Sequence, residues 1–217
     1  KMYGAGKWQF CTFKSNSIGQ GEVNTTPLQV ANEMAYIANK GWYIIPHVVD
    51  SIGGGDTHGL LDRFKQKHTS VTIRDSVFEA VHDGMQGVME SGTGRAAKID
   101  GIVVCGKTGT VENYYRGVKQ KNHSFFAAFA PRKNPKIAIM CVVENAGFGS
   151  TYAAPIVSLM IEKYLKGTIT DKGRLAKIDQ LEKTTLIPGK IYAEYKRQDS
   201  IRHIKDTGYL IQKGYLK

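Results

Sequence analysis

The stretch that decides the fold is GIVVCGKTGT, residues 101–110, a β-branched run that ends in glycine, lysine and threonine. Two more runs rich in β-branched or aromatic residues follow it, NHSFFAAFAP at 122–131 and KIAIMCVVEN at 136–145. Such residues favour strands, and the short Pro131–Pro135 turn indicates that the last two runs are antiparallel neighbours. We therefore predict a sheet in which 122–131 lies between the other two runs, so that 101–110 lies at one side.

A helix is predicted to precede these strands. Thr26 can cap its N-terminus and Pro27 suits its first position, where the missing N–H is not needed. An apolar face at three-to-four spacing follows, and Gly41 suits the C-terminal stop. The residues expected on that face are Leu28, Ala31, Met34, Ala35 and Ala38.

Two more helices are predicted from the same periodicity. One follows Thr72, which forms a pair like a capping box with Asp75, and its buried face is expected to hold Val77, Val81, Met85 and Val88. Between it and the first helix, residues 51–58 are expected to form a surface loop. The last helix begins near Tyr152, ends before Gly167 and carries Ile156, Leu159, Met160, Tyr164 and Leu165. Helices and a three-stranded antiparallel sheet in this order indicate an α+β fold.

The glycines and lysine of 101–109 also satisfy the P-loop pattern G-x-x-x-x-G-K-T, which would make the chain a nucleotide-binding protein. A P-loop needs a nest of backbone N–H groups followed at once by a helix. Here the variable positions include Ile102, Val103 and Val104, which prefer an extended strand, and the residues after Thr108 do not have a helical pattern. We therefore rank the P-loop as a remote alternative.

The formal net charge of the chain is +11, from thirty Lys and Arg against nineteen Asp and Glu. No aromatic and basic nucleic-acid motif accompanies this charge, so we expect a solvated basic surface and no nucleic-acid partner. Cys11, Cys105 and Cys141 have no metal-binding spacing and are expected to be buried free thiols. Neither a metal site nor a cofactor is predicted. Residues 168–217 have a looser, basic pattern and are interpreted as a C-terminal tail to a domain formed by 1–167.

Six stretches in order make the chain similar to a known family. Ser17-Ile-Gly-Gln-Gly21 leads into Thr26-Pro-Leu-Gln29, Gly92-Thr93-Gly94 precedes Lys107-Thr108-Gly109, and Phe126-Ala-Ala-Phe-Ala-Pro131 and Val143-Glu-Asn-Ala-Gly147 follow. Together they resemble the C-terminal portion of the transpeptidase domain of class B penicillin-binding proteins, of the elongation type known as penicillin-binding protein 2. The resemblance covers roughly residues 15–165. It implies the β-lactamase and DD-peptidase fold, an antiparallel sheet flanked by helices.

The family's nucleophile lies in a Ser-x-x-Lys tetrapeptide on a helix, and none of the ten serines of this chain has a lysine three residues on. A Ser-x-Asn element is not found either, because Ser15, Asn16 and Ser17 have the wrong spacing. We therefore expect a chain that begins after both elements and is inactive alone.

By the same resemblance, Lys107 supplies positive potential for a substrate carboxylate and for proton transfer, and the backbone N–H of Thr110 supplies half of an oxyanion hole. Thr108 and Thr110 offer hydroxyls to the carboxylate, and Gly109 leaves the space that a side chain would fill. Lys107 and Thr110 are the candidate catalytic residues, and Thr108, Gly109 and Thr110 are the candidate substrate-binding residues. Arg116, Lys119 and Lys121 are expected to extend the positive field.

The implied function is a peptidoglycan DD-transpeptidase that cross-links stem peptides through a serine acyl-enzyme and is a β-lactam target. A serine β-lactamase or a β-lactam sensor of the same fold is the alternative, and an interaction module without activity is a third. The implied partners are stem peptides, β-lactams and proteins of the cell-elongation machinery. The implied location is the periplasmic face of the bacterial inner membrane, with the membrane anchor outside this chain.

Overall fold

The computed structural model describes residues 8–21, 23–69, 72–115, 117–187 and 189–212. The chain divides into two compact units, Lys1–Leu181 and Glu182–Lys217. The first unit contains the sheet and all the predicted helices. The proposed division of the chain at residue 167 stays a prediction.

The main sheet has three antiparallel strands, β3 (Cys105–Val111), β6 (His123–Ala130) and β7 (Ile137–Val143), in the order β3-β6-β7. Lys107 lies opposite Ala127, which on its other side lies opposite Met140. This arrangement confirms the predicted sheet, although β3 begins at Cys105 and not at Gly101. The chain turns at Gly101, whose φ is +76°, and Ile102 pairs back with Ile99, so regular pairing with β6 starts only afterwards.

The central strand β6 is covered on both faces. Phe126, Ala128 and Ala130 pack with α4 (Ala153–Lys166), against residues such as Ala153 and Val157. The alternate residues Ala127 and Phe129 pack with α2 (Pro27–Ala38). Since successive strand residues point to opposite faces, α2 and α4 cover opposite sides of the sheet.

Helix α2 begins as predicted. The Thr26 hydroxyl accepts a hydrogen bond from the N–H of Gln29 at 3.3 Å, and the Gln29 side chain accepts one from the N–H of Thr26 at 2.8 Å. This reciprocal capping box satisfies donors that the first helical turn leaves free. Met34 and Ala38 are buried as expected, whereas Leu28 is exposed.

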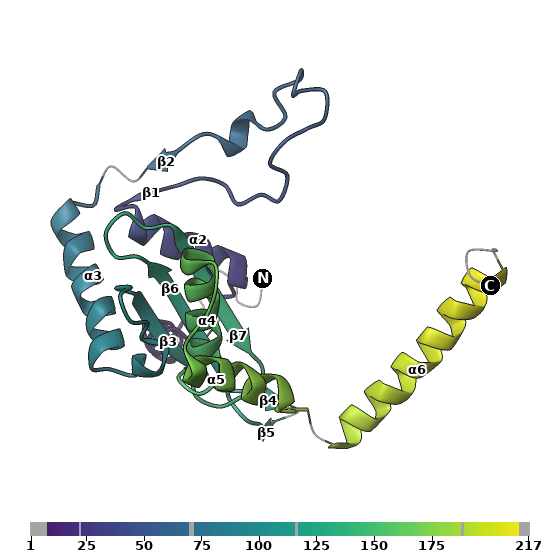
Figure 1. Cartoon of the computed structure of the whole chain (residues 1–217). Helices are drawn as coiled ribbons and strands as arrows, with labels where there is room; N and C mark the ends of the chain where they lie inside the picture. The colour runs from purple at the N-terminus through teal and green to yellow at the C-terminus, as the bar shows by residue number, and fades with distance from the viewer. Residues whose placement is uncertain (1–7, 22, 70–71, 116, 188, 213–217) are drawn as a thin grey trace. The chain divides into compact units, whose positions relative to one another are not determined.

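Helix α3 (Asp75–Glu90) lies beside β3 (Figure 1), but two features of its prediction were wrong. Its N-cap is Arg74, not Thr72. Its buried stripe is Phe78, His82, Met85 and Met89, and Val77 and Val81 are exposed. Met85 is buried as predicted, but the other three buried positions each lie one residue after the expected one, which is about 100° around a helix. The sequence interpretation overlooked that a histidine can be buried when its ring is satisfied, here by the carbonyl of Ile37 at 2.9 Å from Nε2.

Helix α4 also ends as predicted, with Gly167 following it at a φ of +76°. Within α4, Val157 and Ile161 are fully buried, whereas Met160 and Tyr164 are exposed.

Residues 44–67 form a long excursion that extends away from the sheet in Figure 1. It is closed at its base by the short strands β1 (Trp42–Tyr43) and β2 (His68–Thr69) and includes the 3-10 turn η1 (Asp62–Phe64). Residues 51–58 are irregular within it, as expected for a loop.

The remaining elements were not predicted. They are α1 (Phe10–Ser17), η2 (Arg95–Ala97), β4 (Tyr114–Tyr115), β5 (Val118–Lys119), α5 (Lys172–Lys183) and α6 (Gly189–Gln212). Residues 168–217 were interpreted as a segment of loose pattern, but much of this part of the chain is helical.

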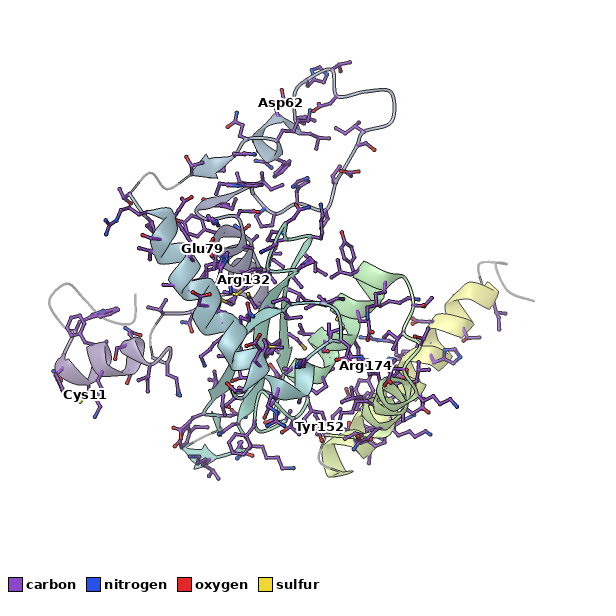
Figure 2. The ribbon with its side chains drawn as sticks, turned by 60° about the vertical axis from the view of Figure 1, so that its left-hand side comes forward. Cys11, Asp62, Glu79, Arg132, Tyr152 and Arg174 are labelled. Carbon is purple, nitrogen blue, oxygen red and sulfur yellow. The ribbon has the colours of Figure 1, made fainter. Side chains whose placement is uncertain are left out.

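Helix α5 is attached to α4 through a buried carboxylate. Glu162 of α4 is 7% exposed and pairs with Arg174 Nε and with Lys166 Nζ, the latter at 3.1 Å. The Arg174 guanidinium also donates to the Ser158 hydroxyl at 2.7 Å and to the Lys98 carbonyl at 3.2 Å. Figure 2 labels Arg174 in this region.

The three cysteines are free thiols, as predicted, but their burial differs. Cys105 is fully buried, and this burial raises its pKa to about 11. Cys141 is half-buried, with its pKa also raised by burial, and Cys11 is exposed. The prediction that all three are buried was therefore wrong for Cys11, which lies in the exposed helix α1.

The displaced face of α3 predicts unequal effects of two substitutions. Met85→Ala should lower the free energy of unfolding by about 2–4 kcal/mol, because it removes buried atoms and leaves a cavity. Val81→Ala, one turn earlier and exposed, should cost less than about 1 kcal/mol. Urea denaturation followed by circular dichroism measures both, and a larger loss for Val81→Ala would contradict the observed face.

Candidate active site at the edge of the sheet

The Lys107-Thr108-Gly109-Thr110 segment lies on β3, the end strand of the main sheet. Lys107 is exposed, and the next three residues are half-buried. Strand alternation places Thr108 and Thr110 on one face and Lys107 on the other. Lys107 lies inside a strand that continues to Val111, so no helix follows it and the P-loop alternative was wrong.

The Lys107 side chain is free for an external partner on this surface. Its Nζ donates to the carbonyl of the adjacent Thr108 at 2.8 Å. Within the described ranges, Lys107 is in none of the ion pairs found. A lysine held only by a neighbouring carbonyl can turn towards an anion.

The backbone at Gly109 is packed closely from both sides. A Cβ on Gly109 would lie 3.2 Å from the Cβ of Phe125. A Cβ on Gly149, in the loop between β7 and α4, would lie 2.7 Å from the Gly109 carbonyl oxygen and would also meet the Phe125 carbonyl. Glycine at 149 therefore lets this loop rest directly on the strand.

Ser124 fixes the same loop from the sheet. Its buried hydroxyl donates to the Phe148 carbonyl at 2.9 Å and accepts from the N–H of Ala153 at 3.2 Å. Because Ser124 lies opposite Thr110 in the register, the start of α4 is positioned relative to the candidate site. Figure 2 labels Tyr152, the residue just before α4.

Thr93 is a site residue that the sequence interpretation missed. Its hydroxyl lies 2.6 Å from the Thr108 hydroxyl. Thr93 belongs to the Gly92-Thr93-Gly94 turn that follows α3, and the only available signal in the sequence was this threonine between two glycines. The turn was recognised only as part of the family resemblance.

The basic loop after β3 differs from expectation. Lys119 pairs with Glu112 at 2.7 Å, and the hydrogen bond from Lys119 lowers the pKa of Glu112. This pairing neutralises a lysine that was expected to extend the positive field. Lys121 is exposed, and Arg116 lies outside the described residues.

The charged groups beside the β6–β7 turn form a separate, paired network. Figure 2 shows Arg132 beside Glu79 of α3. The Arg132 guanidinium lies 3.2 Å from Glu79 and 2.7 Å from Asp83, and Lys40 lies 2.6 Å from Glu79. The hydrogen bond from Lys40, followed by that from Arg132, lowers the pKa of Glu79. A hollow of about 720 Å³ opens here, but none of its lining residues belongs to the 107–110 segment, and we attribute the network to the attachment of α3.

Two other features are absent from the described part of the chain. No group of three His, Cys, Asp or Glu side chains comes together to hold a metal ion. No described helix is both long and apolar enough to cross a membrane.

Comparison with known proteins agrees with this fold. The family model described as penicillin binding protein transpeptidase domain matches residues 3–162. The chain is 34% identical over 165 residues to peptidoglycan D,D-transpeptidase MrdA of Haemophilus influenzae, covering 70% of this chain and 25% of that protein. The chain belongs to the penicillin-binding protein transpeptidase family.

Solved structures narrow the similarity to one type within the family. Penicillin-binding protein 2 of Pseudomonas aeruginosa, in complex with WCK 5153, matches with a TM-score of 0.61 and 32% identity over 76% of this chain and 34% of that one. Penicillin-binding protein A of M. tuberculosis, solved as a ceftriaxone acyl-enzyme, matches with a TM-score of 0.59 and 30% identity over 70% of this chain and 35% of that one. The chain thus corresponds to a transpeptidase domain of the penicillin-binding protein 2 type, and it spans about a quarter of the length of its curated relative.

The contact between Gly149 and β3 predicts a selective effect. Gly149→Ala should lower the free energy of unfolding by about 1–3 kcal/mol, because the added methyl group overlaps backbone atoms that cannot move aside separately. Gly53→Ala is the control, since a Cβ there meets no atom within 4 Å. Equal unfolding midpoints for the two variants in urea would show that the loop does not rest on Gly109.

Proposed function

We propose that this chain forms the substrate-binding wall of a peptidoglycan DD-transpeptidase. The observation that carries the proposal is the Lys107-Thr108-Gly109-Thr110 segment on the end strand of a sheet in a chain of the transpeptidase family. An end strand has backbone groups available on one side, so an extended stem peptide or a β-lactam can lie along it.

The chemistry of acyl transfer assigns a role to each residue of this wall. In the complete enzyme, meaning a protein in which a Ser-x-x-Lys helix precedes this chain, the serine oxygen bonds to the carbonyl carbon of the substrate. The carbonyl C–N bond then breaks, and the serine proton is delivered to the leaving nitrogen. The N–H of Thr110 is one of the two donors to the oxyanion that forms during this attack.

The remaining groups bind the substrate carboxylate. Lys107 contributes a positive charge near it and favours proton transfer at the nucleophile. Thr108 and Thr110 share one face of β3, so both hydroxyls can donate to the same carboxylate. Gly109 leaves the space that a side chain would fill on the opposite face, which it shares with Lys107. The Lys107 ammonium is exposed and makes no ion pair within the described ranges, which suits this role.

Two further proposals follow from the same function. The complete enzyme acts at the periplasmic face of the bacterial inner membrane, and it acts with proteins of the cell-elongation machinery. The alternative of the same fold is a serine β-lactamase or β-lactam sensor. The fate of the covalent adduct with a penicillin distinguishes these functions. A fluorescent penicillin that stays bound indicates a transpeptidase or a sensor, and rapid turnover indicates a β-lactamase.

The proposal predicts the effect of removing the lysine charge. In the complete enzyme, Lys107→Ala should raise the barrier to acylation by benzylpenicillin by about 2–4 kcal/mol, because a carboxylate partner and part of the proton-transfer field are lost. Stopped-flow acylation rates test this, with Lys133→Ala on the exposed β6–β7 turn as the control. A Lys107→Ala enzyme that acylates at the wild-type rate would make Lys107 a surface lysine.

The missing tetrapeptide predicts the behaviour of residues 1–217 alone. Incubated with excess benzylpenicillin, this polypeptide should show no mass increase, because a serine without a neighbouring base is too weak a nucleophile at neutral pH. The comparison is a longer polypeptide that includes a Ser-x-x-Lys helix, which should gain one penicillin. Intact-mass spectrometry reads both. An adduct on one of the ten serines of the shorter polypeptide would refute the account.

A further inference from the structure

We propose that Thr93 is a positioning residue for substrate binding, which holds the Thr108 hydroxyl in the orientation that donates to the substrate carboxylate. This inference rests on the proposed function and adds a residue that the Lys-Thr-Gly motif does not contain. It arises from the contact between two hydroxyls that lie 15 residues apart in the sequence.

The contact itself limits how Thr108 can use its hydrogen. The two Oγ1 atoms are 2.6 Å apart, a short O–H···O distance, and either atom can be the donor. Each hydroxyl carries one hydrogen. If Thr108 donates to Thr93, its hydrogen is occupied. If Thr93 donates to Thr108, the Thr108 hydrogen is free for an external acceptor.

A carboxylate at Thr108 selects the second arrangement. An ionised carboxylate only accepts hydrogen bonds, so it requires the Thr108 hydrogen. Thr93 then donates to Thr108, and Thr108 donates to the carboxylate, in a chain where each bond polarises the next. Among the hydrogen bonds found in the described residues, the Thr108 hydroxyl has Thr93 as its one protein partner. Thr93 is therefore the group that can set its orientation.

The turn that carries Thr93 is held by close packing. A Cβ on Gly92 would lie 2.8 Å from the Val88 Cα, and a Cβ on Gly94 would lie 2.8 Å from the Met89 sulfur. The N–H of Gly92 donates to the Gly87 carbonyl at 3.1 Å, and that of Gly94 donates to the Val88 carbonyl at 3.0 Å. The end of α3 thus fixes the position of Thr93 before any substrate binds, which reduces the entropy lost on binding.

The exposure of the pair argues against a role in stability. Thr93 is exposed, and the hydrogen bond lies at the surface. Two hydroxyls that water can reach exchange one set of hydrogen bonds for another on folding, so their mutual bond contributes little net stability. A role in orienting the Thr108 hydroxyl explains this fixed turn and its exposed Thr93 hydroxyl better than a role in stability does.

The test compares acylation of the complete enzyme and of its Thr93→Val, Thr93→Ser and Thr108→Val variants, with the double Val variant. Valine keeps the shape of threonine without the hydroxyl, and serine keeps the hydroxyl. The probes are benzylpenicillin and its methyl ester, in which the carboxylate is masked. The second-order acylation rate constant and the melting temperature are measured for each variant.

Thr93→Val should slow acylation by benzylpenicillin by about fivefold or more, while Thr93→Ser stays within about twofold of the wild type. In the Thr108→Val background, Thr93→Val should change the rate by less than about twofold, since the two hydroxyls act as one unit. With the methyl ester, the effect of Thr93→Val should also fall below about twofold, because no carboxylate remains for Thr108 to bind. The melting temperatures should be unchanged.

Three outcomes would contradict the proposals, and each has a different meaning. If the wild-type enzyme acylates normally and the Thr93→Val variant acylates at the same rate, this inference alone is overturned. The same holds if Thr93→Val slows acylation equally with both probes. Thr93 has a structural role instead if Thr93→Val lowers the melting temperature and slows acylation as much in the Thr108→Val background as in the wild type. A complete wild-type enzyme that forms no adduct would overturn the proposed function, and this inference with it.

Discussion

The burial of strand β6 on both faces is the constraint on which the rest of the fold depends. The side chains of Phe126, Ala128 and Ala130 face α4, and those of Ala127 and Phe129 face α2. A one-residue slip in its pairing would exchange these two sets and place each against the wrong helix. The register with β3 is therefore specified, and it places Lys107 opposite Ala127 and Thr110 opposite Ser124. The candidate site is thus positioned by the packing of a strand that contributes none of its proposed catalytic groups.

Much of this arrangement could be predicted from local patterns. The cap at Thr26, the three strands, their order and the stop at Gly167 each follow from the conformational preference of a few residues. The phase of α3 could not be predicted in this way, because valines and methionines compete for the buried face and only the tertiary partner of His82 decides between them. The helical character of residues after 168 was missed for a related reason. These segments lack a clear apolar stripe, and α5 is attached through a charged group of α4.

The candidate site shows the same division between local and tertiary information. The Lys-Thr-Gly segment and its strand conformation were predictable, since β-branched residues before it disfavour a nucleotide-binding loop. Thr93 was not, because its partner lies 15 residues away and the contact depends on how the end of α3 meets β3. Gly149 likewise has no local signal. Its importance appears only where its backbone rests on that of Gly109.

Glu162 gives the attachment of α5 a particular character. A carboxylate that is 7% exposed costs a large desolvation free energy, which the Arg174 and Lys166 side chains offset. Two apolar surfaces tolerate many similar substitutions, but a buried ion pair does not tolerate the loss of one partner. Evolutionary change at these positions should therefore occur in a concerted way, with Glu162 and Arg174 retained together or replaced together by uncharged residues. Buried charges are also weakly screened, so added salt should loosen this attachment much less than it loosens the exposed pairs of α6.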